Sequence, residues 1–323
     1  MKHRIPVKIV AVLITVVLLA LLFTQINFED VITTLKNINP MYLIAGFILY
    51  TCSYFFRAWR FHLLLNREVS TKDLFDIECV HNAMNNLLPA RTGELSYVYL
   101  LKKMNNKTVG DGVATLVVAR IFDFIALIIL FFIAVVLIIA IPKIIMDALW
   151  IIAFFAIFLL IVLVLLLTKG KKFVIGVQKT AERLHWDNNA GVHYLIRKGF
   201  ETVDSLDKIQ MKKSIVPLVT SSLLIWGFNY FVIYILMMGM NFQISILLVI
   251  LGGTFILLTT VLPIQGIAGF GTTETIWTLV FVPLGLSLDQ AIISGFCYHI
   301  VIILYFAILG LYGWITTRAK INL

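Results

Sequence analysis

The chain has 323 residues, of which 61% are hydrophobic and 13% are charged, and its formal net charge is +9. A soluble domain cannot bury that much apolar surface, so the composition excludes a soluble globular protein. The basic residues gather at helix ends and in one loop, which is typical of membrane orientation signals. No nucleic-acid partner is therefore expected.

Long apolar runs predict membrane-spanning helices, because a helix needs about 20 apolar residues to cross a bilayer. Such runs lie at about 5–24, 41–65, 109–141, 144–168, 214–238 and 288–316. The first run is too long for the apolar region of a signal peptide, and no small-residue cleavage site follows it. We predict that it is retained as a span.

The distribution of charge predicts the orientation of these spans. Basic residues lie at the N-terminus, after the last span (Arg318 and Lys320) and in the 169–213 connection, which has twice as many basic as acidic residues. We therefore expect a multi-pass protein of the cell membrane with both termini in the cytoplasm. Apolar residues recur at helical spacing within 173–184 and 195–206, which predicts two amphipathic helices on the inner leaflet.

Two further apolar stretches, 74–103 and 244–286, are each interrupted by the same succession of residues. A Leu-Pro pair comes first, a glycine-containing turn follows, and a glutamate begins the next helix. Proline lacks a backbone N–H and glycine permits positive φ, so the chain must leave helical geometry there. Bare loop backbone is not tolerated against lipid, so each break must be buried in protein or line a watery cavity. The residues expected to shape the breaks are Pro89, Gly93, Pro263, Gly269 and Gly271.

The order of these elements predicts an all-α integral membrane protein, a polytopic helical bundle with two inverted repeats. Each repeat is a span, a broken, re-entrant-like hairpin and a second span. We place repeat 1 at about 41–141 and repeat 2 at about 214–316, within a single transmembrane domain of residues 1–323. Inverted repeats with broken helices indicate a transport site near the midplane. The alternative is that each hairpin is two short packed helices joined by a structural turn.

One face of the first hairpin is polar. Glu78, Asn82, Asn85 and Asn86 lie at helical spacing, with His81 beside them. At membrane depth such a face indicates a hydrated cavity, and the alternative is a packed polar network.

Charged residues near the first break are candidates for substrate binding. Arg91 is expected to face an anionic headgroup while Glu94 caps the next helix, and a local ion pair between them is the alternative. Arg120 and Asp123, three residues apart on one span, must neutralise each other or face the interior and contact the substrate. Asn86 joins these residues as a candidate for substrate binding.

Other charges allow more than one interpretation. Arg57 and Arg60 lie near a predicted cytoplasmic helix end, and we expect at least one of them to snorkel to the interface. In the second break, backbone N–H groups at the helix start favour an anion such as phosphate, whereas Glu274 favours a cation or a proton. Glu274 is also a candidate substrate-binding residue, and His299 is expected to be an ordinary core histidine.

Catalytic chemistry has little support in the sequence. The pattern Glu78-x-x-His81 is half of a carboxylate-bridged metal site, but no second copy is present. There is no H-E-x-x-H, G-x-S-x-G or Walker A sequence. The cysteines Cys52, Cys79 and Cys297 are far apart and are expected to be core residues. We therefore expect no catalytic residue, no metal and no cofactor.

Three segments, Asn85–Glu94, Arg120-x-x-Asp123 and Gly266–Glu274, resemble a known family. It is the flippase-like membrane region of lysylphosphatidylglycerol synthase (the MprF type), which also occurs as stand-alone bacterial and archaeal membrane proteins. The resemblance covers nearly the whole chain. It implies movement of a lipid, such as an aminoacylated phosphatidylglycerol, between leaflets, with links to lipid metabolism and antibiotic resistance. By match to the motifs, the functional or framework positions would be Asn86, Pro89, Arg91, Gly93, Glu94, Arg120, Asp123, Gly269, Gly271 and Glu274.

We therefore predict a lipid translocase that handles an anionic or aminoacylated phospholipid headgroup. Membrane phospholipid is the expected partner, and the sequence is also compatible with a homo-oligomer. One alternative is a lipid-headgroup transferase, either lysyl or glycosyl, and another is a non-catalytic partner of envelope enzymes. The full synthase carries a soluble aminoacyl-transferase domain that this sequence does not contain. For this reason we favour a transporter over a phosphatidylglycerol lysyltransferase.

Overall fold

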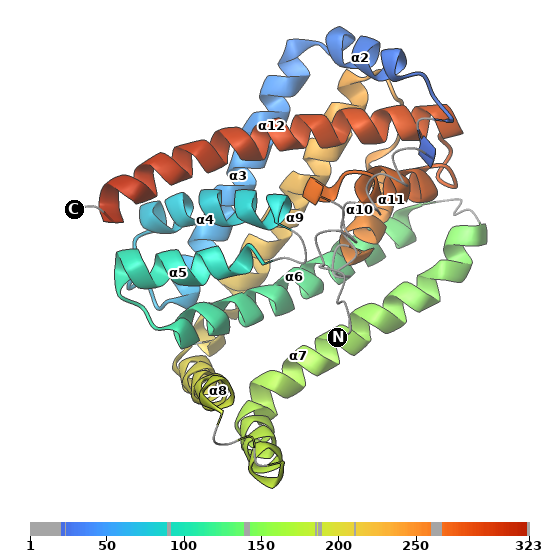
Figure 1. Cartoon of the computed structure of the whole chain (residues 1–323). Coiled ribbons are helices and arrows are strands. Elements are labelled where there is room, and N and C mark those ends of the chain that lie inside the picture. Colours follow the sequence, from blue (N-terminus) through green and yellow to red (C-terminus); the bar gives the residue numbers. More distant parts are fainter. Residues whose placement is uncertain are drawn as a thin grey trace, which may run out of the picture.

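A computed structural model of the chain (Figure 1) describes residues 21–22, 24–88, 92–138, 143–184, 186, 189–209, 211–259 and 267–321. Every regular element within these ranges is helical, as the sequence predicts. In chain order the elements are α2 (Phe28–Asn37), α3 (Pro40–Leu64), α4 (Thr71–Leu87), α5 (Glu94–Asn105), α6 (Val109–Leu137), α7 (Lys143–Arg183), α8 (Ala190–Lys208), α9 (Met211–Gly239), α10 (Ile246–Thr259), the 3-10 turn η2 (Ile267–Gly269), α11 (Thr272–Phe281) and α12 (Leu288–Ile321).

Four helices are long and apolar enough to cross a membrane when the described residues are searched. Each of them coincides with a predicted span, and α12 continues beyond the predicted end at residue 316. The predicted span at 5–24 falls almost entirely outside the described residues. The four segments are Pro40–Leu64 in α3, Val109–Leu137 in α6, Ile215–Gly239 in α9 and Leu288–Ile321 in α12.

Local chemistry fixes where the helices of the first unit begin. Asn39 accepts a hydrogen bond from the Met41 N–H at 2.9 Å at the start of α3, and Ser70 caps α4 in the same way. Thr108 and Asp111 form a reciprocal capping box at the start of α6. Such caps satisfy N–H groups that have no partner within the helix. They also fix the point from which each helix presents its later side chains.

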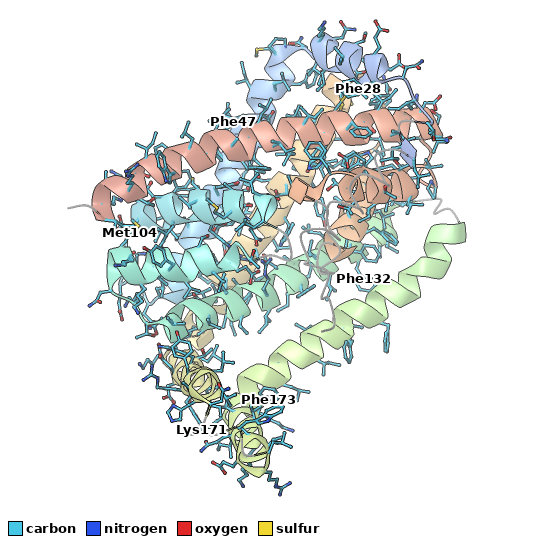
Figure 2. The ribbon with its side chains drawn as sticks, viewed as in Figure 1. Phe28, Phe47, Met104, Phe132, Lys171 and Phe173 are labelled. Carbon is cyan, nitrogen blue, oxygen red and sulfur yellow. The ribbon has the colours of Figure 1, made fainter. Side chains whose placement is uncertain are left out.

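α7 differs from the prediction. The predicted span at 144–168 and the first predicted amphipathic helix form one continuous helix of 41 residues. Gly170 and Gly176 lie within it, but a glycine costs a helix only about 1 kcal/mol and no proline interrupts this stretch. The second amphipathic helix is separate, as α8. Lys171 and Phe173 lie on the part of α7 that approaches α8 (Figure 2), and the two helices are in contact.

The two predicted repeats pack crosswise. The leading spans α3 and α9 pack against each other, while α4 of the first unit packs on α12 and α10 of the second unit packs on α6. Within each unit, the first hairpin helix contacts the leading span and the second hairpin helix contacts the closing span. Each of these contacts of the first unit thus has a counterpart at the same position in the second unit, which supports two corresponding repeats. Their inversion across the membrane stays a prediction.

Small residues bring α4 and α12 close together. A Cβ added at Gly313 would lie 2.6 Å from the Cβ of Cys79 and 2.7 Å from the carbonyl oxygen of Asp76. One added at Gly310 would lie 2.5 Å from the Cβ of Ala83. Glycines allow this close approach of helices inside membranes. α4 thereby lies closely alongside α12 (Figure 1).

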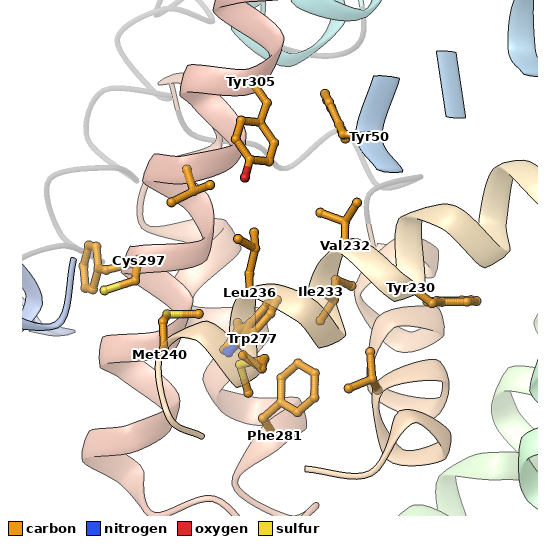
Figure 3. Close-up of a cluster of buried hydrophobic side chains, with 14 of the residues drawn as sticks. Tyr50, Tyr230, Val232, Ile233, Leu236, Met240, Trp277, Phe281, Cys297 and Tyr305 are labelled. Carbon is orange, nitrogen blue, oxygen red and sulfur yellow. The ribbon is translucent and has the colours of Figure 1, made fainter. Parts of the chain in front are cut away.

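An apolar core forms where α3, α9, α11 and α12 meet (Figure 3). Tyr50, Leu236, Trp277, Phe281 and Tyr305 are among its buried members. Polar atoms within this core have partners: the indole of Trp277 donates to a serine hydroxyl at 3.1 Å, and the hydroxyl of Tyr305 donates to a backbone carbonyl at 2.6 Å. Large apolar side chains on the outside, such as Ile44, Ile48, Phe132, Leu304 and Ile308, fit a lipid environment.

Candidate functional site

A buried ion pair joins α3, α6 and α9. Arg60 Nη1 donates to Asp123 Oδ1 at 2.6 Å, and Arg60 Nη2 donates to Asp123 Oδ2 at 3.3 Å. Two groups of α9 complete the arrangement, since Ser222 Oγ accepts from Arg60 Nη1 at 2.8 Å and Trp226 Nε1 donates to Asp123 Oδ1 at 2.9 Å. A bidentate pair with additional hydrogen bonds is the form in which buried charges are tolerated. This pair is therefore a structural centre of the bundle.

The sequence predicts that Arg57 or Arg60 snorkels to the interface, but in the structure both side chains point into the protein. Arg60 is 2% exposed and turns inward to Asp123. Arg57 also faces the interior, with its guanidinium 5.6 Å from the ring centre of Trp226 and its Nε 3.9 Å from Glu78 Oε1. The reason is that Asp123 and Glu78, on neighbouring helices, give both arginines an opposite charge inside the protein.

Glu94 and Arg120 form a more accessible pair beside the first break. Glu94 begins α5, and Arg120 Nη2 donates to its Oε1 at 2.7 Å. The predicted partner Asp123 is only a loose contact, with its Oδ2 3.9 Å from Arg120 Nη1. The side chain of Arg120 is 29% exposed, against 16% for Arg57 and 2% for Arg60. Of these three arginines, Arg120 is the one that a ligand reaches most easily.

The polar face of α4 is a packed network at one end and exposed at the other. Glu78 is buried, and its Oε2 lies 3.0 Å from His81 Nδ1 while its Oε1 faces Arg57. Asn86 is exposed and turns back onto its own helix, where its Nδ2 donates to the carbonyl oxygen and to the Oδ1 of Asn82 at 2.8 Å each. The alternative of a packed polar network therefore holds for Glu78 and His81.

Four buried polar atoms in this region have no hydrogen-bond partner among the described protein groups. They are Arg57 Nε and Arg60 Nε on α3, and His81 Nε2 and Asn85 Oδ1 on α4. An unpaired buried polar atom costs about 1–3 kcal/mol. Each of these atoms is therefore suited to bind a buried water molecule.

Among the described residues of this network, each arginine faces a carboxylate. Arg57, Arg60 and Arg120 face Glu78, Asp123 and Glu94 respectively. Charges inside a membrane bundle are retained when they pair with one another. An anion that binds at the accessible pair of Glu94 and Arg120 therefore competes with the Glu94 carboxylate for the arginine.

The second break is held by Glu274 and His299. Glu274 is fully buried in the first turn of α11, where its Oε2 accepts from the Gly271 N–H at 2.8 Å. Its Oε1 lies 2.6 Å from His299 Nδ1, and His299 Nε2 lies 3.0 Å from the carbonyl oxygen of Ala268. Ala268 has φ +51°, a left-handed conformation that costs an L-residue about 1–2 kcal/mol. His299 is therefore more than an ordinary core histidine, because it ties α12 to a strained turn.

The expectation of an anion site at the backbone of this break is not met by Gly271. Its N–H is already bonded to Glu274, which leaves that donor unavailable to a phosphate. Gly269 and Gly271 have φ of +81° and +79°, a left-handed conformation that glycine adopts without steric cost.

The described residues that flank the two breaks lie near each other in the fold. η2 contacts α4, the helix that leads into the first break. Gly93 closes that break against its own hairpin, since an added Cβ would lie 2.2 Å from the backbone nitrogen of Asn85. Three predicted site residues, Pro89, Arg91 and Pro263, fall outside the described residues.

α8 docks on the start of α6. The N–H of Gly110 donates to Glu201 Oε1 at 2.9 Å, and Lys198 forms an ion pair with the same carboxylate. Burial raises the pKa of Glu201, but the hydrogen bonds from Lys198 and Gly110 outweigh it, so this pKa lies below its ordinary value of 4.5. A cavity of about 220 Å³ lies beside this contact, lined by residues that include Glu68, Lys107, Asp111, Ser205 and Lys208.

Several contributors to the site were missed from the sequence. Ser222 and Trp226 carry no charge, and their role depends on the packing of α9 against α3 and α6. A signal for Arg60 was present, because the apolar run of its helix continues past it to Leu65. Among the residues that the structure describes, no group of three His, Cys, Asp or Glu side chains is placed to hold a metal ion.

Fold and site together define a polytopic helical membrane protein with paired charges at interrupted helices. The chain belongs to the family of the lysylphosphatidylglycerol synthase TM region, which matches residues 8–310. The resemblance noted in three sequence segments is thereby confirmed.

Individual relatives are distant. A UPF0104 membrane protein of Methanocaldococcus jannaschii is 23% identical over 298 residues, which are 87% of this chain and 86% of that protein. Glycosyltransferase AglD of Haloferax volcanii is 32% identical over 122 residues, 36% of this chain and 19% of that protein. A second UPF0104 membrane protein of M. jannaschii is 43% identical over 51 residues, 16% of this chain and 22% of that protein. The chain thus matches about a fifth of the length of the last two relatives. No solved structure matches it.

Proposed function

We propose that this protein moves a phospholipid with an anionic or aminoacylated headgroup between the leaflets of the cytoplasmic membrane. The observation that carries the proposal is the accessible pair of Arg120 and Glu94, placed at the first helix break and backed by the buried pair of Arg60 and Asp123. A headgroup phosphate offers an arginine the same charge-assisted hydrogen bonds that a carboxylate does.

Binding in this proposal is an exchange of partners. The phosphate takes the place of Glu94 at Arg120, while Asp123 keeps Arg60 and the core stays intact. The released carboxylate of Glu94 then pairs with the ammonium group of an aminoacylated headgroup. Arg91, which lies three residues before Glu94, adds a second cation for the phosphate. The acyl chains stay in lipid between the helices.

The orientation belongs to the same proposal. The basic 169–213 connection and the basic chain ends favour the cytoplasm for the loop and for both termini. The two breaks then open to the membrane from opposite sides, as expected for alternating access by inverted repeats.

Leaflet exchange of fluorescent phosphatidylglycerol in liposomes tests the proposal. We expect exchange with the wild-type protein and a loss of at least about tenfold in Arg120→Ala and Arg91→Ala, the effect of removing one charged hydrogen bond. Arg197→Ala, on the exposed face of α8, is the matched control and should exchange normally. Unimpaired exchange by Arg120→Ala would remove that residue from the site. A wild-type protein that exchanges neither phosphatidylglycerol nor its aminoacylated form would overturn the translocase.

A transferase is the second candidate, favoured by the partial match to a glycosyltransferase. In that case the network would hold the headgroup of a lipid acceptor while a separate donor supplies the sugar or the aminoacyl group. Product formation by purified protein with lipid and donor supports this candidate, and its absence with a range of donors speaks against it.

A further inference from the structure

The two breaks are built on the same arrangement with one difference. In each unit, a glutamate in the first turn after the break pairs with a cationic side chain on the closing span. Glu94 pairs with Arg120 at 2.7 Å, and Glu274 pairs with His299 at 2.6 Å. Arginine is permanently charged, whereas histidine gains and loses its proton near neutral pH. Of these two pairs, only that of Glu274 and His299 in the second unit can release a proton.

The two hydrogen bonds of the His299 ring require that the pair of His299 and Glu274 holds an extra proton. A carbonyl oxygen only accepts, so the contact with Ala268 places a hydrogen on His299 Nε2. The 2.6 Å contact between His299 Nδ1 and Glu274 Oε1 needs a second hydrogen, carried by either atom. The pair therefore holds one proton more than a neutral imidazole beside an ionised carboxylate. The geometry is that of the protonated pair.

Loss of this proton changes the shape of the break. A singly protonated His299 turns a lone pair towards either the Glu274 carboxylate or the Ala268 carbonyl, and both contacts cannot then persist. Ala268 is held in its left-handed conformation at that carbonyl, and Gly269 beside it is left-handed as well. η2 is in contact with α4 of the first unit. A change in the turn is therefore transmitted to the helix that leads into the first break.

Among the described residues, no other charged side chain pairs with Glu274 or His299. No described charged side chain besides these two comes within ion-pair distance of either one, and α10 and α11 contain no other charged residue. On α4, Glu78 pairs with His81 and Arg57, and the two aspartates pair with α12. The helices packed against η2, α11 or α12 carry further charged or titratable residues, besides Glu274 and His299 themselves. They are Glu29, Asp30 and Lys36 of α2, Arg57, Arg60 and His62 of α3, Lys72, Asp73, Asp76, Glu78 and His81 of α4, Glu94, Lys102 and Lys103 of α5, Lys212 and Lys213 of α9, and Asp289, Arg318 and Lys320 of α12.

We infer that Glu274 and His299 form a proton-binding site, and that binding and release of this proton drive the second break between two shapes during lipid movement. The second half of this inference rests on the proposed function, and the first half does not. The proton enters from water on one side of the membrane, bridges His299 Nδ1 and Glu274 Oε1, and leaves to water when the turn opens. One proton is taken up and released in each cycle.

The protonation state of His299 is measured directly by nitrogen NMR of histidine-labelled protein in detergent. We expect His299 Nε2 to carry a hydrogen and a second hydrogen to be shared between His299 Nδ1 and Glu274 Oε1, and we expect this second hydrogen to be lost when the pH is raised. His299→Gln assigns the signal by its disappearance. His193→Gln, on the exposed face of α8, is the control that removes a different signal. A His299 Nδ1 that shares no hydrogen with Glu274 at any pH measured overturns the site.

Glu274→Gln separates the hydrogen bonds from the proton. A glutamine amide donates to His299 Nδ1 through its nitrogen and accepts from the Gly271 N–H through its oxygen. The turn keeps its bonds, but no proton can be released from them. We therefore expect this variant to fold like the wild type and to show no titration of His299.

Lipid exchange under an imposed pH gradient tests the coupling. One pH unit changes the ratio of protonated to unprotonated pairs about tenfold, so the wild-type exchange rate should change severalfold with the gradient. Glu274→Gln should not respond to the gradient at all. A wild type that exchanges lipid equally with and without the gradient overturns the coupling. A wild type that exchanges no lipid removes the proposed function instead, and the NMR titration still decides the proton site.

Discussion

Arg60 on α3 and Asp123 on α6 are 63 residues apart in the sequence and share two hydrogen bonds inside the bundle. Ser222 and Trp226 of α9 bind the same pair. Three spans thus meet at one buried charge pair, while the neighbouring Arg120 remains accessible beside the break. The arrangement separates a residue that holds the helices together from one that is free to exchange its partner.

Arg60→Ala should destabilise the protein strongly. The change leaves the carboxylate of Asp123 buried without its main counter-charge, which costs about 3–5 kcal/mol. The double variant Arg60→Ala/Asp123→Asn removes both charges and should recover part of this loss. Thermal unfolding in detergent, followed by tryptophan fluorescence, measures both variants. Equal instability of the single and double variants would show that the charge of Asp123 is not the cause.

Glu94→Gln should make anion binding tighter. In the wild type, the headgroup phosphate must displace the Glu94 carboxylate from Arg120, and a neutral amide competes less well. We expect affinity for a short-chain phosphatidylglycerol to rise about tenfold, the equivalent of about 1.4 kcal/mol. Affinity for the aminoacylated form should rise less, because its ammonium group loses a carboxylate partner. Calorimetric titration of the purified protein with both lipids distinguishes this result from a uniform change.

Gly313→Ala should loosen the packing of α4 on α12. The added methyl group would lie 2.6 Å from the Cβ of Cys79 and 2.7 Å from backbone, so the helices must move apart. Overpacking of this kind costs about 1–3 kcal/mol. Gly227→Ala on α9 is the matched control, since nothing lies within 4 Å of its added Cβ, and alanine favours a helix by about 0.5–1 kcal/mol. Opposite shifts in melting temperature are expected, and equal shifts would contradict the close contact.

The docking of α8 should weaken in acid. The pKa of Glu201 is lowered on folding, so its contribution to stability is complete above its ordinary pKa of 4.5 and disappears as the pH falls through the folded value. Hydrogen exchange of α8 amides, corrected for the intrinsic effect of pH, should therefore accelerate below about pH 4.5. Glu201→Gln should be less protected at neutral pH and should lack this acid transition. An identical pH profile in both proteins would assign the docking to other contacts.

Much of the architecture was predictable, and the reasons are local. Apolar length marks the spans, and a Leu-Pro pair followed by glycine marks each break wherever it occurs. α7 was divided wrongly because its basic stretch looks like a loop in hydropathy, although lysines and isolated glycines do not end a helix.

The pairing of charges was not predictable to the same degree. Which arginine meets Asp123 depends on how α3, α6 and α9 rotate against one another, and no spacing within one helix contains that information. The spacing of Arg120 and Asp123 suggested a mutual pair, yet each has a closer partner on another helix. His299 likewise gains its role only when α12 packs against a turn near residue 268.

The crosswise packing has a consequence for how the chain assembles. Each hairpin rests its first helix on the closing span of the other unit, so neither half of the sequence contains a complete partner for its own hairpin. If the chain were cut between α7 and α8, the two fragments would be expected to remain incomplete alone and to find each other in the bilayer. Each half of the sequence therefore depends on the other half in the way that one subunit of an obligate dimer depends on its partner.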